Sequence, residues 1–134
     1  MNINITGGVR LTVNDDPARV IAFDPDDVGF VERFYGLMGD LEVKQKEFEA
    51  REAELEKDPE NIKGQIALLK DLCGYMRGRI DAVFGEGTSR AAFGDANSLV
   101  MFQQFFEGIA PHIQKARGER ISKYTNSAPK GVMR

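Results

Sequence analysis

The residues best suited to chemistry run from Phe84 to Ser98, FGEGTSRAAFGDANS. This stretch holds a Gly-x-Gly at residues 85–87 and two Phe-Gly steps, each followed by an acidic residue. A phosphate-binding loop requires glycines directly after a strand, then a lysine and a Ser or Thr for the metal. Here the glycines follow a predicted helix, and no Gly-Lys-Ser/Thr is present. The stretch therefore disfavours nucleotide binding.

The other reactive side chains do not form a catalytic or metal-binding set. His112 is the only histidine and has no acid or cysteine at ligand spacing, although metal sites need several such ligands. Cys73 is the only cysteine and falls on an apolar helical row. The aspartates between residues 15 and 27 lack the ligand spacing of a calcium loop. We therefore predict a protein that is not an enzyme and binds no cofactor or metal.

Length and composition restrict the class of protein. A chain of 134 residues supports one domain with a real core. The net charge of -3 disfavours specific nucleic-acid binding, which calls for a basic surface. No run approaches the roughly 20 apolar residues of a membrane helix, and the first residues lack the pattern of a secretory signal. A single cysteine allows no intrachain disulfide, which fits a reducing cytoplasm.

The first 23 residues show the alternation of β-strands. Ile3 and Ile5 precede Gly7-Gly8, and β-branched or apolar residues alternate from Val9 onward. Alternation around a Gly-Gly step predicts a hairpin with its turn at these glycines. A further turn is expected at residues 14–17, and residues 19–23 are a candidate third strand.

Two amphipathic helices are predicted next. Asp24 before Pro25 marks a helix start, with Asp24 as the cap and more acids in the first turn. A heptad row predicts a long, highly charged helix that ends at Asp58-Pro59. This row is Phe34, Leu41, Phe48 and Leu55. A second helix over residues 59–84 carries the row Ile62, Ile66, Leu69, Cys73, Met76, Ile80 and Val83. The two should form an antiparallel hairpin that packs along these rows.

We interpret the stretch from Phe84 to Ser98 as a compact connection, or corner, between two helices. We expect Gly85 or Gly87 to close the second helix and Gly94 to close a short one over residues 90–93. Thr88 or Ser89 would cap the short helix. Phe84 and Phe93 would lie in the core at the two ends of the connector. Such a corner serves architecture alone, or presents a surface to a partner.

A third helix is predicted from Asn97 or Ser98, either of which is a suitable cap, to residue 122. Pro111 lies inside it and should kink or break it. We predict a mainly α fold with a small N-terminal β-hairpin. The single domain spans residues 1–124, with the hairpin in 1–23 and the helices in 26–122. Residues 125–134 form a disordered basic tail.

The order of elements and the motif resemble the tail assembly chaperones of long-tailed phages and prophages of Gram-positive bacteria. The positions that match the family's Phe-Gly-Glu-Gly-Thr, second Phe-Gly and following Asn are Phe84, Gly85, Glu86, Gly87, Thr88, Phe93, Gly94 and Asn97. The resemblance implies a non-enzymatic protein in the cytoplasm of the bacterial host. It implies that the protein binds the tape measure protein during tail morphogenesis, and that it self-associates. The motif residues become candidates for partner binding.

Two other classes remain open. A structural tail or connector component would stay in the finished virion. A small helical adaptor would use the basic tail on nucleic acid, and would need basic residues on an exposed recognition helix. The third predicted helix begins LVMFQQFFEGI, without lysine or arginine, and this disfavours the adaptor.

Overall fold

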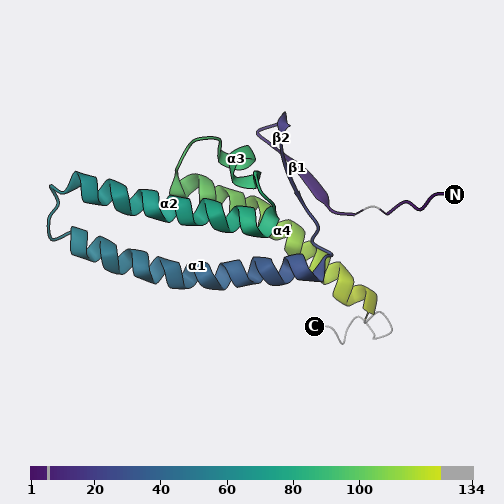
Figure 1. Ribbon diagram of the computed structural model, residues 1–134. Coiled ribbons are helices and arrows are strands. Elements are labelled where there is room, and N and C mark those ends of the chain that lie inside the picture. Colours follow the sequence, from purple (N-terminus) through teal and green to yellow (C-terminus); the bar gives the residue numbers. More distant parts are fainter. Residues whose placement is uncertain (6, 125–134) are drawn as a thin grey trace.

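The fold is mainly α with a small N-terminal β-hairpin, as the sequence predicts. The computed structural model describes residues 1–5 and 7–124, with side chains to residue 118. Its elements are β1 (Val9–Val13), β2 (Asp16–Phe23), α1 (Val28–Leu55), α2 (Ile62–Phe84), α3 (Thr88–Phe93) and α4 (Leu99–Tyr124) (Figure 1). The tail predicted to be disordered, 125–134, lies outside the described residues. No helix in the described part of the chain has the length and apolarity to cross a membrane.

The hairpin turns at the second of the two predicted turns, within residues 14–17, and not at Gly7-Gly8. β1 and β2 are antiparallel, with Leu11 opposite Ile21, and Asn14-Asp15 joins them. Both turn residues have positive φ, 54° and 59°. A two-residue turn of this kind matches the twist of the strands, and Asn and Asp tolerate it better than other non-glycine residues. The predicted turn at Gly7-Gly8 is therefore wrong, and the candidate third strand is part of β2.

The start of α1 also differs in detail. Asp27 is the N-cap, and its Oδ1 accepts a hydrogen bond from the Gly29 N–H at 2.9 Å. Asp24 instead closes a turn, because its Oδ1 accepts from the Asp26 N–H and its carbonyl accepts from the Asp27 N–H. Pro25 belongs to this turn and not to the first helical turn, which contains no acidic residue. The predicted cap was thus placed too early.

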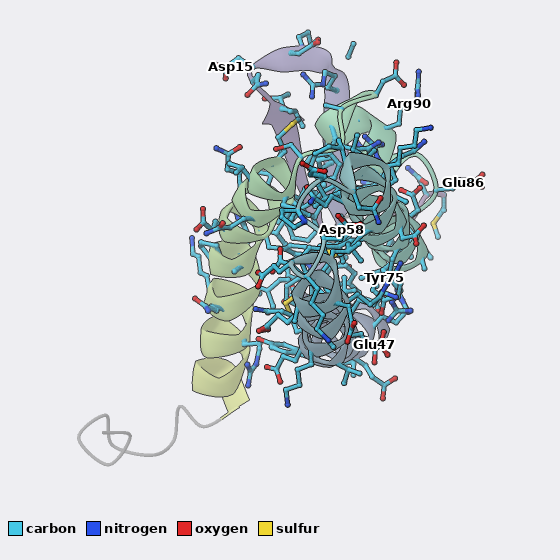
Figure 2. All side chains as sticks on the ribbon, turned by 90° about the vertical axis from the view of Figure 1, so that its left-hand side faces the viewer. Asp15, Glu47, Asp58, Tyr75, Glu86 and Arg90 are labelled. Carbon is cyan, nitrogen blue, oxygen red and sulfur yellow. The ribbon has the colours of Figure 1, made fainter. Side chains whose placement is uncertain are left out.

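α1 and α2 form the predicted antiparallel hairpin (Figure 1). α2 begins at Ile62 and not at Pro59, because Asn61 is its N-cap and accepts a hydrogen bond from the Gly64 N–H at 2.9 Å. Figure 2 looks onto the tip of this hairpin, near Asp58, and shows α4 along one side of the helix pair. α4 lies beside only part of the hairpin, so the tip projects beyond it (Figures 1 and 2).

Pro111 does not end α4, which continues from Leu99 to Tyr124. Proline removes the hydrogen bond to the carbonyl four residues earlier, that of Glu107. Pro111 and Glu107 are both exposed, so this carbonyl can turn toward water. The helix begins after Ser98, whose Oγ accepts from the Met101 N–H at 3.4 Å, as one of the two predicted caps.

The core lies where β2 meets the parts of α1, α2 and α4 that are distant from the hairpin tip, a region that we call the body. Phe84 is at its centre, with ring centroids 5.7 Å from Phe23, 5.2 Å from Phe30 and 5.2 Å from Phe105. These three rings come from β2, α1 and α4. The side chains with the lowest exposure are Leu37, Ile80, Phe102 and Ile113. α1 and α2 thus each contribute one of these side chains to a single core, and α4 contributes two.

The turn position can be tested with glycine. Asp15→Gly should raise the free energy of unfolding by about 1 kcal/mol, because glycine adopts positive φ without the strain of an L side chain. Urea denaturation measures this change. Gly7→Ala is the control and should be nearly neutral, because Gly7 does not have positive φ. A destabilised Gly7→Ala together with an unchanged Asp15→Gly would place the turn at the glycines after all.

Candidate functional site

The glycines of the Phe-Gly motif set the path of the backbone. Gly85 ends α2 at φ 118°, and its N–H donates to the Asp81 carbonyl at 2.9 Å. Gly87, at φ 91°, precedes α3, and Gly94, at φ 60°, ends it. Positive φ is costly for L side chains, so each of these positions favours glycine. The sequence prediction for these glycines as helix ends is confirmed for Gly85 and Gly94.

The side chains of the remaining motif positions differ in burial, and Glu86 and Asn97 are exposed. Phe93 and Thr88 are buried, and Phe84 packs against the core, as the spacing of the two aromatic residues predicts. Neither Thr88 nor Ser89 caps α3, because both lie inside the helix. The carboxylate of Asp81, on α2, takes that role by accepting from the Ser89 N–H at 2.8 Å and from its hydroxyl at 3.1 Å.

Arg77 on α2 holds the loop between α3 and α4. Its Nε donates to Asn97 Oδ1 at 2.8 Å, and its Nη2 donates to the carbonyls of Gly94 and Ala96. Its guanidinium also lies over the Phe93 ring, 5.6 Å from the centroid. One planar group therefore fixes three of the motif positions, Phe93, Gly94 and Asn97.

Arg19 on β2 makes the matching contact with the end of α3. Its guanidinium donates to the carbonyls of Ala91 and Ala92 at 2.8 and 2.7 Å. These carbonyls lie in the last turn of α3, where a cation is favourable. The sequence analysis missed both arginines, because their partners are backbone atoms that are distant along the chain.

Glu86 is the motif side chain that the corner does not use. Its side chain is exposed and makes no hydrogen bond or ion pair with the residues that the structure describes. In Figure 2 it points away from the helices. The other motif residues have a structural reason for their type. A partner that contacts the motif would reach Glu86 and the exposed loop backbone at Gly85 and Gly87.

A second feature lies on α2 toward the hairpin tip. Ile62, Ile66 and Leu69 are exposed by 56%, 52% and 42%. They recur at spacings of three and four residues and continue the row of Cys73 and Ile80, which are buried. The predicted burial of this first half of the row against α1 is therefore wrong, although Leu69 still lines a hollow with Phe48 of α1. Leu68 is the buried side chain there, and it lines a small hollow with Phe48 of α1.

The exposed row adjoins an open groove, which we call the distal groove. It consists of two hollows of about 500 and 320 Å³ that share Phe48 and Glu52. Its apolar lining comes from Leu41, Phe48, Leu55, Leu68, Leu69, Leu72, Met76, Leu99, Phe102 and Phe106. Its charged lining is Lys44, Glu49, Glu52 and Glu56, one cation against three anions. The groove starts where α4 begins and extends toward the tip.

The reactive side chains Cys73 and His112 are buried or packed against other side chains. Burial raises the pKa of the Cys73 thiol, and the Arg77 charge opposes this only in part, so the thiol is a poor nucleophile near neutral pH. The His112 ring packs edge-on against Phe23, 6.1 Å between centroids. Within residues 1–5 and 7–118, no three His, Cys, Asp or Glu side chains come together in a way that could hold a metal ion. The described surface is thus suited to binding by shape and charge.

Comparison with known proteins assigns the chain to a family but does not supply an activity. Residues 18–131 match the model of a family of unknown function (DUF6673), and the chain belongs to this family. No curated protein and no solved structure matches the chain. The distal groove and the Phe-Gly corner are therefore interpreted from their own geometry and from the sequence resemblance.

The role of Arg77 in the corner is open to a direct test. Arg77→Lys should lower the free energy of unfolding by about 1–3 kcal/mol, because an ammonium group cannot reproduce the planar fork that binds Asn97 and two carbonyls. Denaturant titration measures the loss. Arg90→Lys is the matched control, since Arg90 pairs with Asp95 on the surface and both side chains are well exposed. Equal effects of the two substitutions would contradict the assigned role.

Proposed function

We propose that this protein is a non-enzymatic tail assembly chaperone of a phage or prophage, and that it binds the tape measure protein during tail morphogenesis in the cytoplasm of the bacterial host. The partner class comes from the sequence resemblance carried by the Phe-Gly motif. The mode of binding comes from the distal groove. An apolar groove between helices is a common receptor for an amphipathic helix.

The observation that carries the proposal is the interrupted row on α2. Near the body the row is buried by the rest of the core, as at Cys73 and Ile80. Toward the tip the same row continues as Ile62, Ile66 and Leu69 without a covering helix among the described residues. A partner helix placed beyond Leu99, in line with α4, would cover these side chains and the groove beside them.

The charges of the groove select the kind of helix. The three glutamates and one lysine of its lining favour a partner whose apolar face is flanked by basic residues. A tape measure protein is long and helical, so it can offer such segments repeatedly. Many weak contacts along one long partner gain from avidity, while each single contact stays reversible. Reversibility suits a chaperone that must leave before the tail tube closes.

The first test is co-expression with the tape measure protein encoded downstream, followed by affinity purification. The wild-type chain should keep the tape measure protein soluble and co-purify with it. Leu69→Asp and Leu99→Asp should each lower the recovered tape measure protein by about tenfold or more, because each places a carboxylate in the apolar contact. Both side chains are partly exposed and line the groove, so the variants should fold.

Val43→Asp is the matched control. Val43 is an apolar residue of α1, exposed by 60%, that does not line the groove, so this variant should bind like wild type. Circular dichroism should show unchanged helix content in all three variants. Wild-type binding by both Leu69→Asp and Leu99→Asp would show that the distal groove is not the binding site. Absence of any interaction, with the protein retained in purified virions, would favour a structural tail or connector component.

A further inference from the structure

We infer that residues 1–5 form an exchanged β-strand, which adds to the free edge of β1 in a second copy of this chain. This inference deepens the self-association that accompanies the proposed function. It rests on a different surface from the distal groove, and its test uses no tape measure protein. The two proposals can therefore fail separately.

The N-terminal arm, residues 1–5, has the pattern of a strand that is buried on one face. Met1, Ile3 and Ile5 alternate with Asn2 and Asn4. The Asn2 amide donates to Asn4 Oδ1 at 3.1 Å, which places these two side chains on the same side of an extended chain. Ile3 and Ile5 are 82% and 90% exposed. An arm without charged side chains thus exposes its apolar side chains to water, at a cost that burial would remove.

The arm leads away from the sheet of its own chain. In Figure 1 it extends outward from the start of β1, away from α1, α2 and α3. Residues 1–5 are all exposed, and the residues that connect them to Val9 include Gly8 with φ 90°. In this direction the arm does not lie against its own β1, so a second copy could reach it.

β1 offers an edge for such a strand. The sheet has two strands, and β2 is the one that lies beside α3. In an antiparallel pair every second residue directs its N–H and C=O away from the partner strand. Within the part of the chain that the structure describes, no hydrogen bond satisfies these outward groups of β1. A third strand would pair with them by β-augmentation.

A hollow beside β1 fits the apolar face of the arm. It measures about 250 Å³ and is lined by Leu11, Thr12 and Val13 of β1, by Phe93, and by Met101 and Phe105 of α4. Leu11 packs against the core whereas Thr12 is exposed, so the hollow extends around the edge of the strand. An added strand would continue the row of Leu11 and Val13 with Ile3 and Ile5 over α4. Its asparagines would then lie on the outer face beside Arg10 and Thr12.

The mass of the protein in solution is the first test. By size-exclusion chromatography with light scattering, the wild-type chain should be a dimer or larger. Ile3→Asp/Ile5→Asp should be monomeric with unchanged circular dichroism, because these side chains contribute nothing to the fold of one chain. Asn2→Asp/Asn4→Asp adds the same charge on the opposite face and should keep the wild-type mass. A monomeric wild type, or an Ile3→Asp/Ile5→Asp variant that keeps the oligomer, would overturn the inference.

A cysteine cross-link distinguishes exchange between chains from closure within one chain. Differently tagged Asn4→Cys and Thr12→Cys proteins, mixed and mildly oxidised, should form a disulfide-linked heterodimer. Arg10→Cys covers the neighbouring register. The native Cys73 is buried and should not compete. A chain carrying both Asn4→Cys and Thr12→Cys that forms only an internal disulfide, with no heterodimer from the mixture, would overturn the exchange.

Discussion

The packing around Phe84 is the interaction on which the rest of the structure depends. Its ring meets Phe23 of β2, Phe30 and Phe34 of α1, and Phe105 of α4. These elements have few other reasons to converge, because α1 is largely polar and the sheet has only two strands. A two-stranded hairpin is marginal alone and needs an apolar surface to pack on. The aromatic cluster provides that surface and fixes the end of α2, from which the corner and α4 follow.

In the corner after Phe84, glycines with positive φ and two arginines determine the direction in which the chain runs from α2 to α4. Gly85 stops α2, and Gly94 stops α3. Arg19 and Arg77 then donate hydrogen bonds to backbone carbonyls at the end of α3 and in the loop that follows. Buried or partly buried carbonyls need donors, and a guanidinium satisfies several at once. The path into α4 is thus set by backbone hydrogen bonding, while the aromatic rings of the motif anchor it to the core.

The sequence was most informative where a local pattern has a single physical reading. The heptad rows predicted the helical hairpin, and glycine positions predicted the ends of α2 and α3. The predicted turn within residues 14–17 is confirmed, but the hairpin was assigned to Gly7-Gly8. These glycines are the stronger turn signal by residue type, whereas the twist of the strands selects Asn14-Asp15. The apolar row on α2 predicted that one face of this helix is apolar. It could not predict which part of that face other elements bury, because this depends on where α4 begins. The roles of Arg19, Arg77 and Asp81 could not be predicted, because their partners are fixed only by the tertiary fold.

The uneven distribution of buried side chains along the helical hairpin gives its two ends different stabilities. Phe30, Phe34 and Leu37 are the buried residues of α1, and all lie near the body. Between Leu41 and Cys73, the buried side chain of the hairpin is Leu68. Local opening follows such gradients, so the tip should fray and re-form far more often than the body. In the complex proposed above, a tip of this kind would adapt its helix spacing to segments of varied sequence. The entropy lost when the tip becomes ordered on binding would keep each contact weak enough to be released.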